Sequence, residues 1–313
     1  MARIAFLGPP GTFTEEALLT QPDLAGAELV ELRSMPDVLA ATQDGEVELG
    51  FVALENSIEG TINVSLDSLV FEHDVLIQRE VVLPISLNLM APSGARLADI
   101  KRVVSFGPAT AQCRGWLAAN LPGAELVAAN STAEAAQVVA EGRVSEAAAV
   151  GNALAAKLYG LEIVAGDIED HRENSTRFVL VAADGIPAPT GHDKTSIVCF
   201  QSADRPGSLH AILGQFTARD INLTKLESRP TKKGLGEYCF IIDLDGHVDD
   251  EPVADCLRDL HVALPRVKFL GSYPAAGAHG PTRRRDAEQA WRVADDWIAS
   301  LRRKMEGPAM DGP

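Results

Sequence analysis

Residues 1–182 alternate short, β-branched apolar runs with alanine-rich runs, and this alternation constrains the fold more than any other feature of the chain. β-Branched runs suit buried strands and alanine-rich runs suit helices, so the order predicts βαβ units around mostly parallel sheets. The pattern occurs twice and therefore indicates two similar α/β lobes. The strands expected in the two sets cover 3–7, 28–32 and 49–54, then 102–105, 125–128 and 147–150. The helices expected between them cover 14–20, 36–43, 109–120 and 132–141.

Two stretches join the expected lobes. Residues 75–90 form a long apolar run that can cross from the first lobe to the second, and residues 177–182 would make the return crossing. Two lobes joined by two crossings enclose a cleft, which is a common place for small ligands. The predicted domain covers 1–183, with one lobe at about 1–80 and 165–183 and the other at about 84–164.

A second domain is expected after a glycine- and proline-containing linker at 183–194. The order strand, helix, strand, strand, helix, strand over 195–274 predicts the ferredoxin-like βαββαβ arrangement. The expected elements are 195–201, 208–219, 222–228, 237–244, 251–264 and 268–273. A last amphipathic helix is expected at 283–306, because Trp291, Ile298 and Leu301 recur at helical spacing.

Charge and cysteine content limit the partners of the chain. Its formal charge is −16, from 28 Lys and Arg against 44 Asp and Glu, which argues against binding to nucleic acid or an anionic membrane. No apolar run approaches the roughly 18 residues that cross a bilayer, and residues 1–8 are too short for a signal peptide. The four cysteines are widely spaced, so neither a metal site nor a disulfide frame is expected. A reducing, cytoplasmic location fits this composition.

Two polar loops follow expected strands of the first lobe. The segment Gly8–Phe13 leads into a helix whose N–H groups can face an anion, although Thr12 with Glu15 also matches a capping box. Its spacing fits neither a dinucleotide fingerprint nor a P-loop. Glu55–Ser57 follows the strand at 49–54, where open α/β sheets bind ligands, and the alternative is a polar loop that caps the next helix.

Further candidates come from the second lobe and from the segment before the last strand of the domain. Ser105 ends a strand and Gln112 lies one turn into the next helix, so both side chains are either cleft residues or local hydrogen-bond formers. The segment 171–178 is dense in donors and places the Thr176 hydroxyl beside the Arg177 cation, which is more typical of a site than of a solvated loop. The chain offers no convincing Ser/His/Asp grouping.

Five motifs in a fixed order carry a resemblance to a known family. They are Gly8-Pro9-x-Gly11-Thr12-Phe13, Glu55-Asn56-Ser57-x-x-Gly60, Ser105 with Gln112-Cys113, Asp170-x-x-x-Asn174-x-Thr176-Arg177-Phe178, and Glu227-Ser228-Arg229-Pro230. Over about residues 3–274 the series resembles the prephenate dehydratases. The resemblance implies an α/β fold with a two-lobed catalytic domain, similar to type II periplasmic binding proteins, and a ferredoxin-like ACT regulatory domain.

The sequence departs from the family pattern at two places. Ser105-Phe106-Gly107 stands where the family often has Ser-His-Pro, so a histidine role there is absent. The ACT motif often written Gly-Ala-Leu-Val is here Gly207-Ser208-Leu209-His210, which bears on effector affinity. The chain also begins directly with an expected strand instead of a chorismate mutase domain, and a monofunctional enzyme is therefore expected.

The resemblance implies roles for individual residues. Thr176 would serve the leaving hydroxyl of the substrate, Asn56 and Gln112 would hold the substrate across the cleft, Ser105 would assist, and Glu55 would orient its neighbours. Arg177 and the N–H groups near Gly11 and Thr12 would receive the substrate carboxylates. The other implied substrate contacts are Phe13, Ser57, Asn174 and Phe178.

The implied reaction is the decarboxylating dehydration of prephenate to phenylpyruvate in L-phenylalanine biosynthesis, without a cofactor or metal and under feedback control by L-phenylalanine. The implied effector site comprises Pro206, Gly207, Ser208, Leu209, Asn222, Glu227, Ser228, Arg229 and Pro230. ACT domains commonly pair, so a homodimer is expected, with a homotetramer as the larger form. Arogenate dehydratase and a non-catalytic amino-acid sensor are the alternatives.

Overall fold

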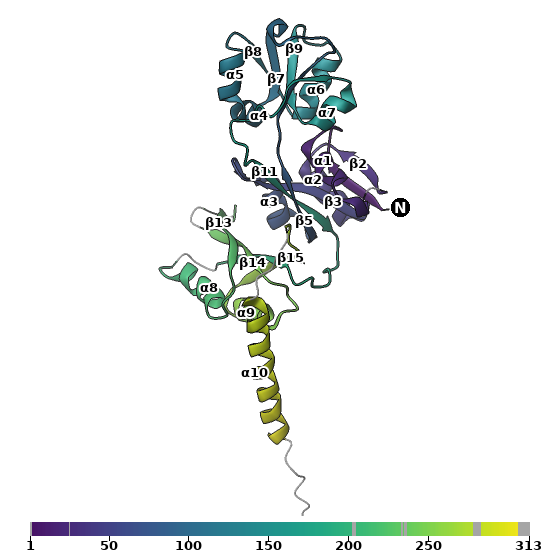
Figure 1. Ribbon diagram of the computed structural model, residues 1–313. Coiled ribbons are helices and arrows are strands. Elements are labelled where there is room, and N and C mark those ends of the chain that lie inside the picture. The colour runs from purple at the N-terminus through teal and green to yellow at the C-terminus, as the bar shows by residue number, and fades with distance from the viewer. Residues whose placement is uncertain are drawn as a thin grey trace, which may run out of the picture. The chain divides into compact units, whose positions relative to one another are not determined.

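The computed structural model describes residues 2–24, 26–201, 205–232, 234, 237–277 and 283–305. The chain divides into two compact units, Met1–Gly185 and Ile186–Pro313, and Figure 1 shows the elements of both. Across the described residues, no helix has the length and apolar character needed to span a membrane.

The first lobe of the first unit is built on a six-stranded sheet with the order β2-β1-β3-β11-β5, to which β4 adds beside β3. Its strands are β1 (Arg3–Leu7), β2 (Glu28–Leu32), β3 (Leu49–Asn56), β4 (Gly60–Thr61), β5 (Leu76–Pro84) and β11 (Ser175–Ala182). Its helices are α1 (Phe13–Leu19), α2 (Met35–Gln43) and α3 (Asn63–Asp67), with short turns of helix at Pro22–Leu24 and Ser68–Glu72. β1 is parallel to β2 and β3, whereas β11 is antiparallel to both β3 and β5.

The second lobe has a five-stranded sheet with the order β10-β6-β9-β7-β8. Its strands are β6 (Asn88–Ala91), β7 (Arg102–Phe106), β8 (Glu125–Ala129), β9 (Ala147–Gly151) and β10 (Glu162–Ala165). Its helices are α4 (Gly107–Gln112), α5 (Arg114–Asn120), α6 (Thr132–Ala140) and α7 (Ala153–Tyr159), with a 3₁₀ turn at Leu97–Asp99. The expected two-lobed α/β architecture is thus confirmed.

The helix expected at 109–120 is two helices, α4 and α5, separated at Cys113. The carboxylate of Asp170 accepts hydrogen bonds from the backbone N–H groups of Gly115 and Trp116, at 2.8 and 3.1 Å. These N–H groups belong to the first turn of α5, where a helix leaves its donors unsatisfied. The break therefore lets a side chain from the segment before β11 cap a new helix.

One expected crossing is present and the other is displaced. β5 and β6 follow each other along the chain and belong to different sheets, so residues 85–87 cross between the lobes as expected. The return crossing expected at 177–182 is wrong, because β11 pairs with β5 along its whole length inside the first sheet. The chain instead returns between β10 and β11, over residues 166–174.

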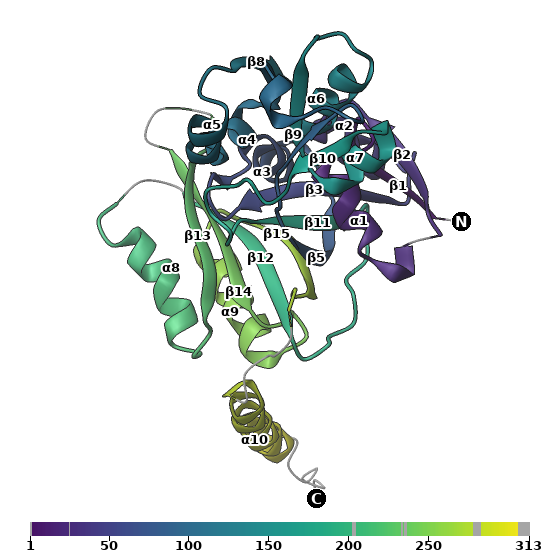
Figure 2. The ribbon, with the colours of Figure 1, turned by 45° about the horizontal axis from the view of Figure 1, so that its top comes forward.

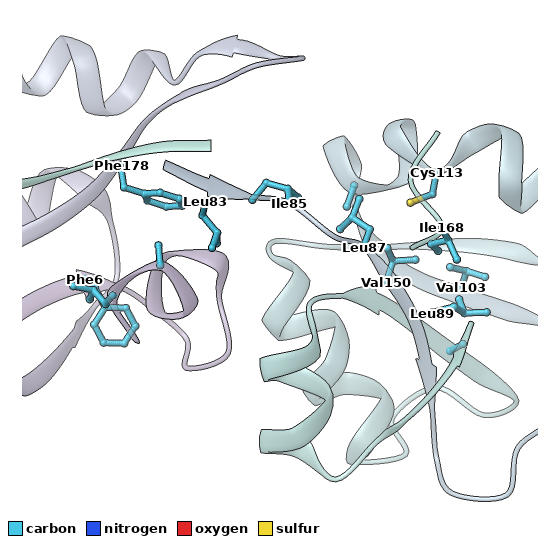
Figure 3. Packing of buried hydrophobic residues seen from close by; sticks show 14 of the residues in the cluster. Phe6, Leu83, Ile85, Leu87, Leu89, Val103, Cys113, Val150, Ile168 and Phe178 are labelled. Atoms are coloured by element: carbon cyan, nitrogen blue, oxygen red, sulfur yellow. The ribbon is translucent and has the colours of Figure 1, made fainter. Parts of the chain in front are cut away.

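Alternate residues of the first crossing carry a single core from one lobe to the other, as Figure 3 shows. Leu83, Ile85, Leu87 and Leu89 all belong to this buried cluster. On the side of the first lobe, Phe178 stacks on Phe51 with ring centroids 5.4 Å apart and planes 9° from parallel. The two lobes therefore share one hydrophobic core.

The second unit contains a four-stranded sheet with the order β13-β14-β12-β15 and the helices α8 and α9, labelled in Figure 2. Its elements are β12 (Asp193–Phe200), α8 (Ser208–Thr217), β13 (Leu223–Pro230), β14 (Tyr238–Asp245), α9 (Glu251–Ala263) and β15 (Arg266–Pro274). The expected βαββαβ order is confirmed. Apolar side chains of both helices pack with those of β12 and β14 in one buried cluster. The helix α10 (Arg283–Met305) follows, and the side chain of Trp291 lies outside the described part of the chain.

Candidate active site

Two of the predicted motifs meet where β3 ends and β11 begins. The antiparallel register pairs Asn56 with Thr176, and the Nδ2 atom of Asn56 donates to the Oγ1 atom of Thr176 at 3.0 Å. Thr176 is only 8% exposed. The site begins with a nearly buried hydroxyl that is held by an amide from the neighbouring strand.

Three amide side chains extend this contact from the first lobe to the second. The Nδ2 atom of Asn56 also donates to the Oδ1 atom of Asn174 at 2.7 Å. The Nδ2 atom of Asn174 donates in turn to the Oε1 atom of Gln112, on α4, at 2.8 Å. Asn174 is buried and 1% exposed. The chain fold thus brings Asn56, Gln112, Asn174 and Thr176 into one network, although they are far apart in sequence.

The hydroxyl group of Thr176 is left with a proton to donate. Its oxygen accepts the hydrogen bond from Asn56, and no described residue accepts one from it. A hydrogen bond accepted by a hydroxyl polarises that hydroxyl and strengthens the bond it donates. The arrangement therefore suits a ligand oxygen that needs a hydrogen bond at this position.

Ser57 joins the loop after β3 to the beginning of β11. Its N–H group donates to the carbonyl of Ser175 at 2.8 Å, and its Oγ atom accepts from the N–H group of Ser175 at 2.9 Å. The same hydroxyl donates to the carbonyl of Glu173 at 3.3 Å. These contacts make Ser57 a brace between the two segments that carry Asn56 and Thr176.

Arg177 lies on the opposite face of the sheet from Thr176, which corrects the expected pairing of this cation with the Thr176 hydroxyl. Its Nε atom donates to Glu80 Oε2 at 2.8 Å, and its Nη1 atom is 3.6 Å from Glu55 Oε2. The side chains of Arg177 and Glu80 are 11% and 3% exposed. Successive side chains of a strand point to opposite faces, so the neighbour of Thr176 in sequence turns away from it.

The loop after β1 also uses its donors within the chain. Thr12 is the N-cap residue of α1, where its Oγ1 atom accepts from the N–H group of Glu15 and donates to the carbonyl of Leu7, both at 3.3 Å. The N–H group of Gly11 donates to Glu15 Oε2 at 2.5 Å. The Gly11 N–H group and the Thr12 hydroxyl thus serve helix capping, whereas the expected capture of substrate carboxylates by N–H groups of this loop stays a prediction.

Three other predicted residues stand apart from the amide network. The Ser105 hydroxyl is 2% exposed and donates to the carbonyl of Phe106 at 3.2 Å. Phe178 is buried in the core, and Phe13 packs against the same cluster. Their places in the structure are those of packing and local hydrogen-bonding residues.

Two contacts between the lobes could not be predicted from the sequence. Asn152 caps α7 and donates from Nδ2 to Glu16 Oε2 at 2.9 Å, and the Tyr159 hydroxyl donates to the carbonyl of Pro10 at 2.8 Å. Burial raises the pKa of the Glu16 carboxyl, and the hydrogen bond from Asn152 opposes that rise. Each contact joins positions more than 130 residues apart, so no local pattern announces it.

Cysteine side chains in the structure are buried and unpaired. All four are free, and burial raises the pKa of Cys113 to about 12, with nearby Asp170 and Glu169 adding to the effect. A thiol of this kind is unreactive and a poor metal ligand. Among the described residues no group of three or more His, Cys, Asp or Glu side chains is arranged to hold a metal ion.

The residues expected to bind an effector lie at two ends of the second sheet. Gly207, with φ of 87°, is the N-cap residue before α8, and Gln201 and Ser208 line one cavity next to the end of β12. Phe200 pairs with Cys239, which pairs with Arg229, so β13 ends at the same end of the sheet as β12. The expected effector residues at this end of the sheet are Pro206, Gly207, Ser208, Leu209, Glu227, Ser228, Arg229 and Pro230.

Asn222 lies at the opposite end of the strands of this sheet. Its Nδ2 atom donates to Asp245 Oδ2 at 2.8 Å, and Asp245 pairs with Lys194 at the beginning of β12. The length of a strand therefore separates Asn222 from Gly207 within one chain. A ligand that touches both residues needs a second chain.

Comparison with known proteins gives consistent matches. The family model described as prephenate dehydratase matches residues 4–185, and the ACT domain model matches residues 195–262. The prephenate dehydratase of Mycolicibacterium vanbaalenii is 42% identical over 316 residues, covering 96% of this chain and 99% of that protein. The solved structure of prephenate dehydratase in complex with L-Phe from Arthrobacter aurescens is 40% identical, with a TM-score of 0.88 and coverage of 96% and 99%. The chain described as GqqA, a novel type of quorum quenching acylase, is 32% identical, with a TM-score of 0.77 and coverage of 88% and 98%.

Proposed function

The chain belongs to the prephenate dehydratase family, a family of lyases, and from this premise we propose that Thr176 donates the hydrogen bond that lets the ring hydroxyl of prephenate depart. The observation that carries this proposal is the orientation of the Thr176 hydroxyl, which accepts from Asn56 and keeps its own proton available. The residues proposed to act with it are Asn56, Gln112 and Asn174.

The chemistry of the reaction explains why one well-placed donor matters. Breaking the bond between the ring and its carboxylate releases CO2, and the electron pair left behind completes the aromatic ring while the hydroxyl group leaves. Aromaticity supplies the driving force, so the enzyme has to stabilise the departing oxygen. A donor to that oxygen becomes more valuable as negative charge develops on it. No metal or cofactor is needed for this step, and that remains a prediction.

The amide network gives the other proposed residues distinct roles. Asn56 orients the Thr176 hydroxyl, while Gln112 brings the second lobe to the same point. Ser57 and Glu55 act through the backbone and the strands that they brace. Ser105, Gly11, Thr12, Phe13, Arg177 and Phe178 are proposed to support the site by packing, capping and ion pairing, because their polar groups are engaged elsewhere or their rings are in the core.

Side-by-side assay of the purified protein with prephenate and with arogenate tests the function directly. We expect conversion of prephenate to phenylpyruvate in the presence of EDTA and without added nucleotide. Faster turnover of arogenate would make the protein an arogenate dehydratase. Amino-acid binding without turnover of either compound would support the non-catalytic sensor, and loss of activity on chelation would contradict the metal-free mechanism.

We further propose that L-phenylalanine is the feedback effector and binds at a pair of ACT domains. β13 is an edge strand of its sheet, and such edges readily pair with a second chain. Antiparallel pairing of two β13 edges about a two-fold axis brings the beginning of one β13 beside the end of the other. Asn222 of one chain would then approach Gly207 of its partner, and the bound L-Phe of the Arthrobacter relative supports this choice of ligand.

Three finer proposals follow from this activity. Phenylpyruvate would feed L-phenylalanine biosynthesis, because an amino-group transfer to its keto carbon yields that amino acid. The assembly is proposed to be a homodimer through the ACT domains, or a homotetramer of two such dimers. A cytoplasmic location is supported by the four unpaired cysteines, since reduced thiols are typical of a reducing compartment.

A further inference from the structure

The amide network of the proposed site closes on itself through Glu59, a residue outside the quoted motif positions. The Nε2 atom of Gln112 donates to Glu59 Oε1 at 3.2 Å. The N–H group of the same Glu59 donates to Asn56 Oδ1 at 3.0 Å. The hydrogen bonds therefore run from Glu59 to Asn56, to Asn174, to Gln112 and back to Glu59. We call these four residues the amide ring.

The amide ring has one direction, which backbone N–H groups set at Asn56 and the Glu59 carboxylate sets at Gln112. The Oδ1 atom of Asn56 accepts from the backbone N–H groups of Ile58 and Glu59, both at 3.0 Å, and these donors turn the Nδ2 atom of Asn56 toward Asn174 and Thr176. A carboxylate only accepts, so it requires the Nε2 atom of Gln112 and turns the Oε1 atom of Gln112 toward Asn174. Each amide then has a single orientation that satisfies both of its neighbours.

We propose that Glu59 is a positioning residue for the dehydration, acting through Gln112. If the Gln112 amide reversed, its Nε2 atom would face the Nδ2 atom of Asn174, and two donors would meet without an acceptor. The carboxylate of Glu59 prevents this reversal and keeps Gln112 joined to the residues beside Thr176. This inference rests on the proposed role of Thr176.

The exposure of Glu59 makes the proposal testable, because a solvent-exposed side chain contributes little to folding. We expect Glu59→Ala to lower kcat for prephenate about tenfold, the usual scale for a hydrogen bond to a charged group. Glu59→Gln retains an acceptor but also offers a donor, so its kcat should lie between those of Glu59→Ala and the wild type. Glu173→Ala is the matched control, because Glu173 is an exposed glutamate nearby that meets Ser57 through its backbone carbonyl.

A double-mutant cycle with Gln112 provides the decisive measurement. If Glu59 acts through Gln112, the variant with both Glu59→Ala and Gln112→Ala should be no slower than Gln112→Ala alone. Multiplied losses in the double variant, or a kcat for Glu59→Ala within twofold of the wild type, would overturn the inference. An equal loss in Glu173→Ala would also overturn it, because the effect would then belong to surface charge.

Two results separate this inference from the function on which it rests. A wild-type protein that leaves prephenate unchanged would remove the proposed function, and the inference with it. A wild-type protein that is active, with Thr176→Ala and Glu59→Ala both converting prephenate at the wild-type rate, would remove the amide ring from the mechanism while the dehydratase activity stands. Thermal unfolding of each variant shows whether a lost activity reflects a lost fold.

Discussion

At the scale of the single residue, the site depends on how an ordinary hydroxyl group is oriented. A threonine hydroxyl is a weak acid in water, so its usefulness depends on where its proton points and on what its oxygen accepts. In this chain the oxygen of Thr176 accepts from Asn56, and the residue is nearly buried. The surroundings of Thr176 thus prepare it to meet an oxygen that gains negative charge.

Replacing Thr176 tests that preparation. We expect Thr176→Ala to lower kcat by about 10²- to 10⁴-fold, the range for removing a positioned acid–base group. Thr176→Ser keeps the hydroxyl and should retain much of the activity. Steady-state assays with prephenate measure both variants, and circular dichroism checks their folding. A Thr176→Ala variant with near-normal turnover would exclude the hydroxyl from the chemistry.

Glu16 offers a second residue-scale prediction, which concerns stability and pH. Burial raises the pKa of its carboxyl in the folded state above the value in the unfolded chain. The folded protein therefore binds this proton more tightly, and the group costs stability at neutral pH, a cost that shrinks as pH falls through the raised pKa. Glu16→Gln keeps an acceptor for Asn152 and should raise Tm at pH 8 by on the order of 2 °C.

The pH dependence of that Tm difference is the control for Glu16. It should shrink as the pH is lowered through the raised pKa of this carboxyl, where the wild-type protein takes up the proton. A difference that stays constant over this range would mean that the glutamine acts through packing instead of charge. Thermal scans of both proteins at matched ionic strength give the comparison.

At the scale of the element, the three adjacent strands β3, β11 and β5 present two faces with different tasks. One face carries Asn56, Thr176 and, further along, the core residue Phe178. The other carries Arg177 between Glu55 and Glu80, one carboxylate on each neighbouring strand. The ion pairs on this second face hold together the strands that place Asn56 beside Thr176.

This view predicts that Arg177 contributes to stability more than to substrate binding. Removing one partner of a buried ion pair costs about 3–5 kcal/mol, because the remaining charge stays buried. We therefore expect Arg177→Met to lower the free energy of unfolding by about this amount, whereas Arg177→Lys should lose less. Urea unfolding provides the measurement. Unchanged stability together with a raised KM would instead support the substrate contact expected from the sequence.

The strand elements also show how far sequence reasoning reaches. Alternating patterns located the strands and both lobes, because burial of one or both faces leaves its record in nearby residues. The motif residues Asn56, Gln112, Asn174 and Thr176 are predicted on another ground, from polar residues near strand ends and from the resemblance to the family. Arg177 was misplaced because its partner Glu80 is 97 positions away, and Glu59 was missed because its role depends on a loop meeting another lobe.

At the scale of the whole molecule, the effector proposal requires two chains. Asn222 and Gly207 lie near opposite ends of the strands of one sheet. Each proposed pocket therefore joins the Gly207 turn of one chain to Asn222 of the other. Feedback inhibition then requires that L-phenylalanine bind one arrangement of the dimer more tightly, with a coupling of about 1–3 kcal/mol being ordinary. Regulation by L-phenylalanine would therefore depend on dimer assembly.

Mixing two defective chains tests this arrangement. Gly207→Val places a β-branched residue at positive φ and should abolish L-phenylalanine binding, and Asn222→Ala should weaken it strongly. A dimer with one chain of each kind has one pocket carrying both changes and one carrying neither. Calorimetry should then find half of the wild-type stoichiometry in the mixed dimer.

The contrary outcome for the mixed dimer is equally clear. A pocket formed within one chain would stay defective in both halves, so the mixture would bind no better than its components. Undiminished binding by the Gly207→Val homodimer would also place the effector elsewhere. Either result would move the effector site away from the pairing of two β13 edges.

The amide ring links the proposed site to the relative placement of the two lobes of the catalytic domain. Both hydrogen bonds of Gln112, to Asn174 and to Glu59, join the second lobe to the first, and hydrogen bonds weaken steeply once donor and acceptor move apart. The contact between Asn56 and Thr176 lies within one sheet, so it does not depend on the second lobe. The hydrogen bonds of Gln112, by contrast, form only when both lobes are in place, so they couple the proposed site to the closure of the catalytic domain.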